Sequence, residues 1–316
     1  MNKVPIILTF DHNMSLPAAI CISSMMQSAE PDTFYEYFIL YSGDIPEIAG
    51  IDKIKKTYSN MSVTYRSVGD VFNGAYEIRG ITAAAYYRLL AAELIPEYDK
   101  VIYADVDMIF RLDMAELYDC DLGDNYLGAV YALGLNTSDD ARDYVHSIGL
   151  TPGDYFLSGF LLMNLAKIRR DGLTDKFVAL AKDDFKYQDQ DIMNIVCCGK
   201  ISSLPYVYSM TVAAFEAVSL KTTLLDTKYM YNPFDRDPLL YSNIHYNGVK
   251  PWKDWCPNMD QWWECYRNSP IYDPAFYFSF FNNKLDYLDQ LSLTKRIKIL
   301  LRYFIFGQKK IKNYDE

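Results

Sequence analysis

The sequence predicts an α/β fold built around a largely buried central sheet, and three features of the chain support this. Short apolar runs alternate with helical patterns about 10 to 15 residues long, as in repeated βαβ units. Residues 4–10 are apolar almost throughout, which is typical of a strand buried on both faces of a parallel sheet. Acidic residues follow two such strands directly, where open α/β sheets bind their ligands. We expect one enlarged domain, with no boundary before about residue 270.

The elements are expected in the following order. The strand over 4–10 ends in Asp11-His12-Asn13, and Ser15 is expected to cap a helix over about 16–29. Thr82 is expected to cap an Ala- and Leu-rich helix over 82–94, which Pro96 ends. Further strands are expected at 34–41, 61–67, from 100 to the Asp-x-Asp pair, 126–131, 155–164 and 200–204; further helices at 46–59, 172–183 and 189–197; and mixed loops and helices over 205–243.

Composition and charge restrict the class of protein. Half of the 316 residues are hydrophobic, and only 15 Gly and 13 Pro are present, so the chain is expected to be ordered and globular. The net charge is −10, and residues 291–312 carry seven basic side chains and no acidic one, which leaves −17 on the rest. An acidic body argues against general nucleic-acid binding, and the basic segment indicates a separate electrostatic role.

The cysteines and the apolar segments suggest a cytoplasmic location. The six cysteines show no CxxC spacing, so they are expected to be buried free thiols in a reducing compartment. The apolar start of the chain is expected to be a first strand and not a secretion signal. No run reaches the roughly 20 apolar residues that cross a bilayer, so we expect a soluble or peripheral protein.

Asp105 and Asp107 lie where an apolar strand ends, and they are the first candidates for a site. Ionised side chains beside a core strand need a partner, because an unpaired buried carboxylate costs several kcal/mol. A hard divalent cation suits two carboxylates that lie two residues apart and point the same way. The alternative is that the pair caps a turn or faces solvent.

A third ligand must come from elsewhere, and His245 is the best of three histidines. A lone histidine is more often structural, but two neighbours favour a role in binding. Gly248 allows backbone N–H groups to approach an anion, and Lys250 supplies a positive charge for phosphate. Together these residues describe a divalent cation bridging a diphosphate.

Four motifs of this chain occur in the order and spacing of glycosyltransferase family 8, which the sequence therefore resembles over about residues 4–265. This family includes bacterial lipooligosaccharide galactosyltransferases, their glucosyltransferase relatives and glycogenin. The motifs are Asp105-Val106-Asp107, His245-Tyr-Asn-Gly-Val-Lys-Pro-Trp252, Tyr187-Gln-Asp-Gln-Asp191 and Tyr87-Arg88-Leu89.

The resemblance implies a GT-A fold, with a Rossmann-like mixed central sheet flanked by helices and followed by a helical C-terminal tail. It also implies the reaction, a retaining transfer of a hexose from UDP-glucose or UDP-galactose, dependent on Mn²⁺ or Mg²⁺. The acceptor would be a glycan or glycolipid in bacterial lipopolysaccharide, capsule or other cell-surface polysaccharide synthesis. Variable loops, at 130–155 and 205–243, are expected to read this acceptor.

The resemblance also assigns roles to individual residues. Asp105, Asp107 and His245 would bind the metal, which in turn binds the diphosphate. The nucleotide and its phosphates would be contacted by Asp11, Asn13, Arg88, Val106, Gly248 and Lys250. Asp189 would bond hydroxyls of the donor sugar, and Gln190 would place its carbonyl near the anomeric carbon. Asp191 is the fallback nucleophile, and the choice between double displacement and front-face attack stays open.

Alternatives to these roles remain. The carboxylates around Gln190 also suit a polar helix N-terminus, where Asp is favoured. The chain departs from the family at Leu157, which replaces an amide, at Ala132, which replaces an acid of galactosyl relatives, at Met14, and in a shorter loop over 248–250. These departures put the identity of the donor sugar in question. They motivate a second hypothesis, a UDP- and metal-binding regulatory protein with impaired turnover. A metal-dependent phosphohydrolase is a third.

The segment 271–316 is expected to be a helical, basic tail. A helix over 291–306 would place Leu293, Ile297, Leu300, Leu301 and Phe304 on one side and Lys295, Lys298 and Arg302 on the other, with Lys309, Lys310 and Lys312 beyond it. This arrangement suits peripheral binding to the anionic inner face of a membrane. The alternative is a terminal helix docked on the body with a solvated basic face.

Overall fold

The computed structural model describes residues 2–78, 82–285 and 291–306. The chain divides into two compact units, Met1–Pro270 and Ile271–Glu316, and each is described by itself. The strands are β1 (Asn2–Thr9), β2 (Thr33–Tyr41), β3 (Met61–Ser67), β4 (Lys100–Ala104), β5 (Met108–Ile109), β6 (Leu127–Tyr131), β7 (Phe156–Asn164), β8 (Ile201–Ser203) and β9 (Ile244–His245).

The helices of the first unit lie between and around these strands. They are α1 (Ser15–Ser28), α2 (Ile51–Thr57), α3 (Ala91–Leu94), α4 (Ala115–Asp119), α5 (Leu133–Thr137), α6 (Asp139–Ser147), α7 (Leu165–Arg170), α8 (Leu173–Leu180), α9 (Gln188–Val196), α10 (Val212–Ser219), α11 (Pro238–Tyr241) and α12 (Met259–Arg267). Five 3₁₀ helices complete the described part of the unit: η1 (His12–Met14), η2 (Ala83–Leu90), η3 (Tyr206–Tyr208), η4 (Thr223–Asp226) and η5 (Lys228–Met230).

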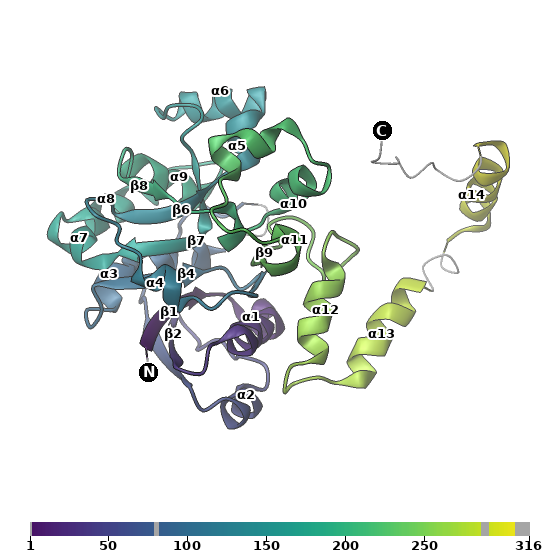
Figure 1. Cartoon of the computed structure of the whole chain (residues 1–316), viewed down its shortest axis with the longest axis horizontal. Helices are drawn as coiled ribbons and strands as arrows, with labels where there is room; N and C mark the ends of the chain where they lie inside the picture. Colours follow the sequence, from purple (N-terminus) through teal and green to yellow (C-terminus); the bar gives the residue numbers. More distant parts are fainter. Residues whose placement is uncertain (1, 79–81, 286–290, 307–316) are drawn as a thin grey trace. The chain divides into compact units, whose positions relative to one another are not determined.

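Within the described residues, the main sheet has seven strands in the order β3-β2-β1-β4-β7-β6-β8, and a second sheet pairs β5 with β9. Strands β3, β2, β1 and β4 are parallel neighbours, whereas β7 is antiparallel to both β4 and β6. Figure 1 shows β6, β7, β4 and β1 in this order through the first unit. The predicted mixed α/β architecture is confirmed.

The core explains why the strands read as unbroken apolar runs. Alternate residues of β1 are buried on opposite faces, so that both Ile6 and Ile7 are completely inaccessible. Ile7 belongs to a large cluster that joins one face of the sheet to η2, α3 and α7 to α9. Helix α1 packs against β5 and α12. The carboxyl ends of β1 and β4 lie side by side because these two strands are parallel neighbours.

Three local predictions were wrong. Ser15 is the first residue of α1 and caps nothing, because the side chain of Asp11 instead accepts the Asn13 N–H, at 2.9 Å, and starts η1. The helix expected over 46–59 begins only at Ile51, after Gly50 adopts the left-handed region at φ +61°. Most of the helix expected over 82–94 is 3₁₀, only Ala91–Leu94 is α-helical, and the side chain of Thr82 makes no capping hydrogen bond.

The cysteines differ in part from the expectation. All six are free, and Cys21 and Cys197 are buried, but Cys120 and Cys198 are exposed and the other two are intermediate. The prediction of buried thiols was therefore wrong for Cys120 and Cys198, which lie at or just beyond helix ends facing solvent.

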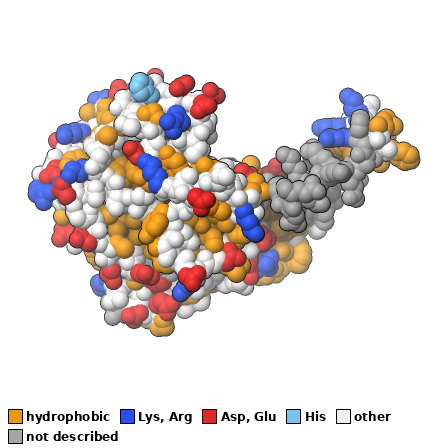
Figure 2. Space-filling model, turned by 45° about the horizontal axis from the view of Figure 1, so that its top comes forward, with side chains coloured by type: hydrophobic (Ala, Val, Ile, Leu, Met, Phe, Trp, Pro, Cys, Tyr) orange, Lys and Arg blue, Asp and Glu red, His pale blue; other side chains and the backbone are white. Residues whose placement is uncertain are grey.

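The second unit contains α13 (Pro274–Leu285) and α14 (Leu293–Phe306). Exposed side chains of α14 include both hydrophobic residues, such as Phe304 and Leu293, and basic ones, such as Lys295 and Arg302. Figure 2 shows hydrophobic and basic side chains beside each other on this helix. The predicted basic residues Lys309, Lys310 and Lys312 lie outside the described residues. In the part of the chain that the structure describes, no helix has the length and apolarity needed to cross a membrane.

Candidate active site

A cavity of about 770 Å³ opens at the carboxyl ends of β1 and β4. Asp11 follows β1 and Asp105 follows β4, and the two strands are parallel neighbours, so both acidic ends meet there. The predicted site residues that line the cavity are Asp11, Arg88, Asp105, Val106, Asp107, Asp189, Gln190, His245, Gly248 and Lys250. Asn13 and Asp191 do not line it.

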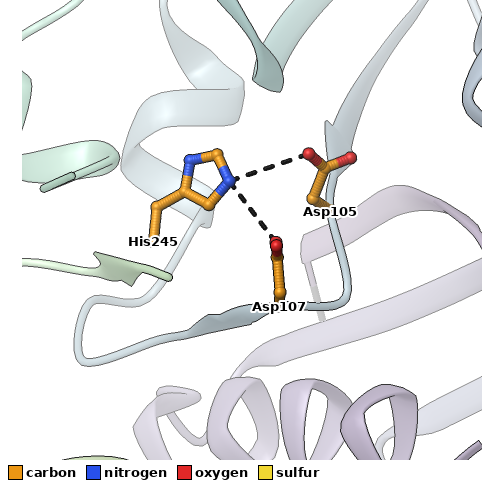
Figure 3. Close-up of side chains that lie close together, drawn as sticks. All are labelled: Asp105, Asp107 and His245. Carbon is orange, nitrogen blue, oxygen red and sulfur yellow. Dashed lines mark ion pairs between the residues drawn. The ribbon is translucent and has the colours of Figure 1, made fainter. Parts of the chain in front are cut away.

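Asp105, Asp107 and His245 lie together in the cavity although His245 is far away in the sequence. Strand β5 pairs antiparallel with β9, which places Met108 opposite His245, and the Tyr246 N–H donates to the Asp107 carbonyl at 3.0 Å. His245 Nε2 then lies 3.4 Å from Asp107 Oδ1 and 3.7 Å from Asp105 Oδ2 (Figure 3). One ligand atom from each residue lies within 4.8 Å of the others.

Each carboxylate of this group directs one oxygen toward His245, and its other oxygen accepts hydrogen bonds from neighbouring side chains. Asp105 Oδ1 accepts hydrogen bonds from Arg88, at 2.9 Å, and from the Tyr103 hydroxyl, at 2.7 Å. Asp107 Oδ2 accepts one from Lys250 Nζ at 2.5 Å. The buried Asp107 Oδ1 accepts no hydrogen bond from any residue that the structure describes. Two carboxylate oxygens and an imidazole nitrogen are a donor set that fits a divalent cation.

Gly159 of β7 leaves the space that such a cation needs. A Cβ atom there would lie 2.4 Å from His245 Cε1 and 2.6 Å from Asp105 Oδ2. The Gly159 carbonyl also accepts the Asp105 N–H at 2.8 Å, so backbone and site are in direct contact. Sequence reasoning gave Gly159 no role, although a glycine inside a strand often marks such a close approach.

Ser209 orients the imidazole. Its hydroxyl lies 3.2 Å from His245 Nδ1, and the backbone N–H of His245 donates to the Met210 carbonyl at 2.9 Å. A hydrogen-bond partner on Nδ1 directs Nε2 toward the two carboxylates. Metal-binding histidines are commonly oriented in this way. No pattern in the sequence points to Ser209.

His245 and Lys250 together keep Asp107 charged. The Lys250 ammonium group donates to Asp107 Oδ2 and, at 2.5 Å, to the Tyr246 carbonyl. Burial alone would raise the pKa of Asp107, but His245 and Lys250 outweigh burial and hold this pKa well below its usual range. Asp107 is therefore ionised at neutral pH. Lys253 lies in the same loop and also lines the cavity, and sequence reasoning missed it.

Arg88 lies beneath the site, where its guanidinium is buried. It donates to Asp105, to the Ser158 carbonyl at 2.5 Å and to the Ala85 carbonyl at 2.9 Å, and it lies over the Tyr103 ring at 4.0 Å. Burial opposes its charge, but Asp105 and Asp189 raise the pKa of Arg88 above its ordinary value. Arg88 thus holds two carboxylates in place.

Helix α9 brings Asp189 and Gln190 to the cavity. Asp189 is 5% exposed and lies 3.3 Å from Arg88 Nε. Burial is the main cause that raises the pKa of Asp189 to about 6; Arg88 opposes this rise, and Asp105 adds to it. Gln190 Oε1 accepts the Ser158 N–H at 3.1 Å.

The structure does not bring Asp191 or Asn13 to the cavity. Asp191 is fully buried, and its oxygens accept hydrogen bonds from the Tyr144 and Tyr155 hydroxyls and the Tyr187 N–H. Asn13 is exposed in η1. The residues that depart from the family pattern, Met14, Ala132 and Leu157, all line the cavity.

Comparisons with known proteins identify the family of this chain. The family described as Glycosyl transferase family 8 matches residues 5–256. The chain is 26% identical to a lipopolysaccharide 1,2-glucosyltransferase of Escherichia coli over 252 residues, which are 78% of this chain and 72% of that protein. It is 26% identical to lipopolysaccharide glucosyltransferase WaaO of Escherichia coli K12 over 96% of this chain and 90% of that protein.

Solved structures include similar folds. A galactosyltransferase, LgtC, in complex with donor and acceptor sugar analogues, superposes with a TM-score of 0.65 at 28% identity, covering 83% of this chain and 95% of that one. The bifunctional glycosyltransferase WbbM has a TM-score of 0.69 at 22% identity, over 87% of this chain and 51% of that one, and supports the fold alone.

Proposed function

The chain belongs to glycosyltransferase family 8 and has the GT-A fold, and on this premise we propose that it is a retaining, metal-dependent hexosyltransferase. The donor is UDP-glucose or UDP-galactose, and the acceptor is a glycan or glycolipid of bacterial lipopolysaccharide, capsule or a related cell-surface polysaccharide. One observation supports this above all: Asp105 and Asp107 each turn one oxygen toward His245 Nε2 in a cavity that Lys250 also lines.

The metal would be held by Asp105, Asp107 and His245. Mn²⁺, or Mg²⁺ in its place, supplies positive charge to the diphosphate when bound. Gly248 and Lys250 contact the phosphates, and the Lys250 ammonium stabilises the negative charge that develops on the departing UDP. Asp107 accepts from Lys250 and therefore positions it.

The nucleotide is expected at the β1 end of the cavity. Asp11 and Val106 line that region, so these two residues contact the nucleoside. Asn13 does not line the cavity, and we assign it no direct contact. Arg88 supports the metal site through Asp105, because its hydrogen bonds are directed to Asp105 and to backbone carbonyls.

The transferred sugar is expected beside α9. Asp189 accepts hydrogen bonds from the hydroxyls of the sugar, and Gln190 places its carbonyl near the anomeric carbon. Asp191, the fallback nucleophile, lies behind these two residues among tyrosine hydroxyls. We therefore assign Asp191 a positioning role in place of a nucleophilic one. The acceptor contacts loops within 130–155 and 205–243, of which Ala132, Leu133 and Thr211 line the cavity.

The two units have different roles, one in catalysis and one in membrane binding. Residues 1–270 form the catalytic domain, and residues 271–316 form a basic tail that binds the anionic inner face of a membrane from the cytoplasm. The tail has exposed hydrophobic and basic side chains on α14, which support this role.

Release of UDP tests the reaction. The full chain is incubated with Mn²⁺ and either UDP-glucose or UDP-galactose and with candidate glycan acceptors, and UDP is measured over time. We expect release with one donor and none from Asp107→Asn or without metal. Absence of release with both donors from the folded protein would contradict the proposal.

Leu157 and Ala132 favour a second function to be tested alongside, because both put apolar side chains into the cavity. A regulatory protein would bind UDP in a metal-dependent way, and turnover would be absent from the wild type and from Gln190→Ala alike. A phosphohydrolase would instead release phosphate from simple phosphate esters.

A further inference from the structure

A buried hydrogen-bonded cluster lies behind Gln190 and involves three tyrosines. Asp191 Oδ1 accepts from the Tyr155 hydroxyl at 2.5 Å, and Asp191 Oδ2 accepts from the Tyr144 hydroxyl at 2.5 Å and from the Tyr187 N–H at 2.8 Å. Asp191 is completely inaccessible, and Tyr155 is too. The cluster joins α6, the residue before β7 and α9, and Gln190, which bonds the Tyr155 hydroxyl, connects it to the cavity.

The proton positions in this cluster follow from its chemistry. A carboxylate offers acceptors only, so each hydroxyl that contacts Asp191 must donate to it. Burial, and then the adjacent Asp191, raise the pKa of Tyr155 well above its ordinary value, so the phenol keeps the proton that it donates. Because this proton is already donated to Asp191, the Tyr155 oxygen can take part in a further hydrogen bond only as an acceptor. Its remaining partner is Gln190 Nε2, at 3.3 Å.

The orientation of the Gln190 amide is then fixed from both ends. Its nitrogen must face Tyr155, since the oxygen of Gln190 would find no proton there. Its oxygen faces the Ser158 N–H, at 3.1 Å, which can only donate. A carbonyl oxygen has two lone pairs, and the Ser158 N–H occupies one of them. The second is available on a side chain that lines the cavity.

We propose that Tyr155 and Asp191 are positioning residues that hold the Gln190 carbonyl oxygen, and not its amide nitrogen, toward the sugar being transferred. This inference rests on the proposed hexosyltransferase function. An amide turned the other way would present N–H donors to a sugar that becomes positively charged as UDP departs, which opposes the reaction. The pair therefore sets the sign of the dipole beside the reacting carbon.

The chain offers a matched pair of variants. Tyr155→Phe and Tyr144→Phe each remove one hydroxyl that donates to Asp191, but only Tyr155 contacts Gln190. Two hydrogen bonds between Asn194 and Phe156 tie α9 to β7 without either tyrosine hydroxyl, so both variants are expected to fold. Thermal unfolding checks this.

We expect Tyr155→Phe to lower kcat about tenfold, the rate equivalent of one hydrogen bond, with KM for the UDP-sugar unchanged. Tyr144→Phe is expected to stay within about twofold of the wild type in both constants. In a Gln190→Ala background, Tyr155→Phe should have little further effect on kcat, because the group that it positions is gone. Equal losses from the two Phe variants, or additive losses with Gln190→Ala, would overturn the proposal.

A measurement independent of turnover separates this inference from the proposed function. In ¹⁵N-labelled protein, the Gln190 side-chain amide protons should exchange slowly in the wild type and in Tyr144→Phe, and faster in Tyr155→Phe. Equal exchange in all three contradicts the positioning. A wild type that releases no UDP contradicts the proposed function, and the amide exchange still shows whether Tyr155 holds Gln190.

Discussion

A Cβ atom on Gly159 would enter the space between His245 and Asp105, which lie 2.4 and 2.6 Å from its position. Separations under 3 Å force one of the two ligands to move. We therefore expect Gly159→Ala to weaken Mn²⁺ binding at least about tenfold, the range seen when metal ligands lose their orientation. Titration of Mn²⁺ followed by electron paramagnetic resonance measures this affinity directly.

Gly134→Ala provides the control for this substitution. Gly134 also lines the cavity, but a Cβ atom there meets no described atom within 4 Å. Its Mn²⁺ affinity should equal that of the wild type. If Gly159→Ala binds Mn²⁺ as tightly as Gly134→Ala, the metal does not lie between Asp105, Asp107 and His245.

Asp189 makes stability depend on pH. Its pKa rises from the ordinary 3.8 to about 6, mainly because it is buried, so the folded protein holds this proton more tightly than the unfolded chain. The resulting stabilisation is complete below about pH 4 and is lost as the pH rises through 6. Relative to Asp189→Asn, the metal-free wild type should lose roughly 3 kcal/mol of unfolding free energy between pH 4 and pH 7.

Urea denaturation of both proteins at the two pH values measures this difference. Asp52→Asn is the matched control, because Asp52 is exposed on α2 and burial is the main cause of the shift at Asp189. Parallel pH dependence of the wild type and Asp189→Asn would show that the carboxylate is not desolvated.

At the scale of elements, η2 departs from its local helix preference around the buried charge of Arg88. Residues 82–94 are rich in Ala and Leu and predict an α-helix, yet Ala83–Leu90 is 3₁₀. Within it, Arg88 Nε donates to the Ala85 carbonyl three residues earlier, while its other nitrogens reach Ser158 and Asp105. The tertiary contacts of Arg88, which no local pattern encodes, accompany the tighter winding.

Arg88→Lys should therefore be costly although the charge is kept. A lysine cannot donate to Ala85, Ser158 and Asp105 together, because it lacks the planar fork of arginine. We expect a loss of about 2 to 4 kcal/mol of unfolding free energy by urea denaturation, together with weaker Mn²⁺ binding as Asp105 loses its support. Arg66→Lys, at an exposed ion pair with Glu97, should change stability by about 0.5 kcal/mol or less. Equal losses of unfolding free energy from Arg88→Lys and Arg66→Lys would mean that the buried contacts of Arg88 do not stabilise the fold.

The parallel half of the sheet could be predicted because its signal is local. Strands β1, β2 and β4 are largely apolar runs, β3 alternates apolar and polar residues, and Asp11 and Asp105 closely follow β1 and β4. Parallel strands then bring their carboxyl ends together without further information. The cavity confirms this, since it contains both residues.

The rest of the site depends on contacts between distant segments, which leave no local pattern. The pairing of β5 with β9 places His245 beside Asp107, but each strand is only two residues long. Ser209 and Tyr155 each contribute one hydroxyl group, and nothing in the sequence distinguishes them from the many other Ser and Tyr residues. The resemblance to the family made Asp191 the fallback nucleophile, yet the helical period turns it toward the core.

At the scale of the whole molecule, one basic segment of the chain contrasts with an acidic remainder. The seven basic residues between 291 and 312 meet no acidic residue in that segment, whereas the rest of the chain carries −17. Four of the seven, Lys295, Arg296, Lys298 and Arg302, are exposed on α14 beside hydrophobic side chains such as Phe304, which is 94% exposed. A lipid surface would cover these side chains and pair their charges.

Charge reversal on α14 should release the protein from anionic membranes. Each basic residue near such a surface contributes about 1 kcal/mol, so replacing Lys295, Lys298 and Arg302 by Glu should weaken binding of the full chain roughly 100-fold. Co-sedimentation with vesicles containing an anionic phospholipid measures this, and phosphatidylcholine vesicles should bind both proteins weakly. The matched control reverses Lys53, Lys55 and Lys56, three exposed lysines of α2, which changes the net charge equally. Equal losses from both triple variants would mean that net charge, and not α14, determines attachment. Undiminished binding of the α14 variant would exclude this helix as the contact.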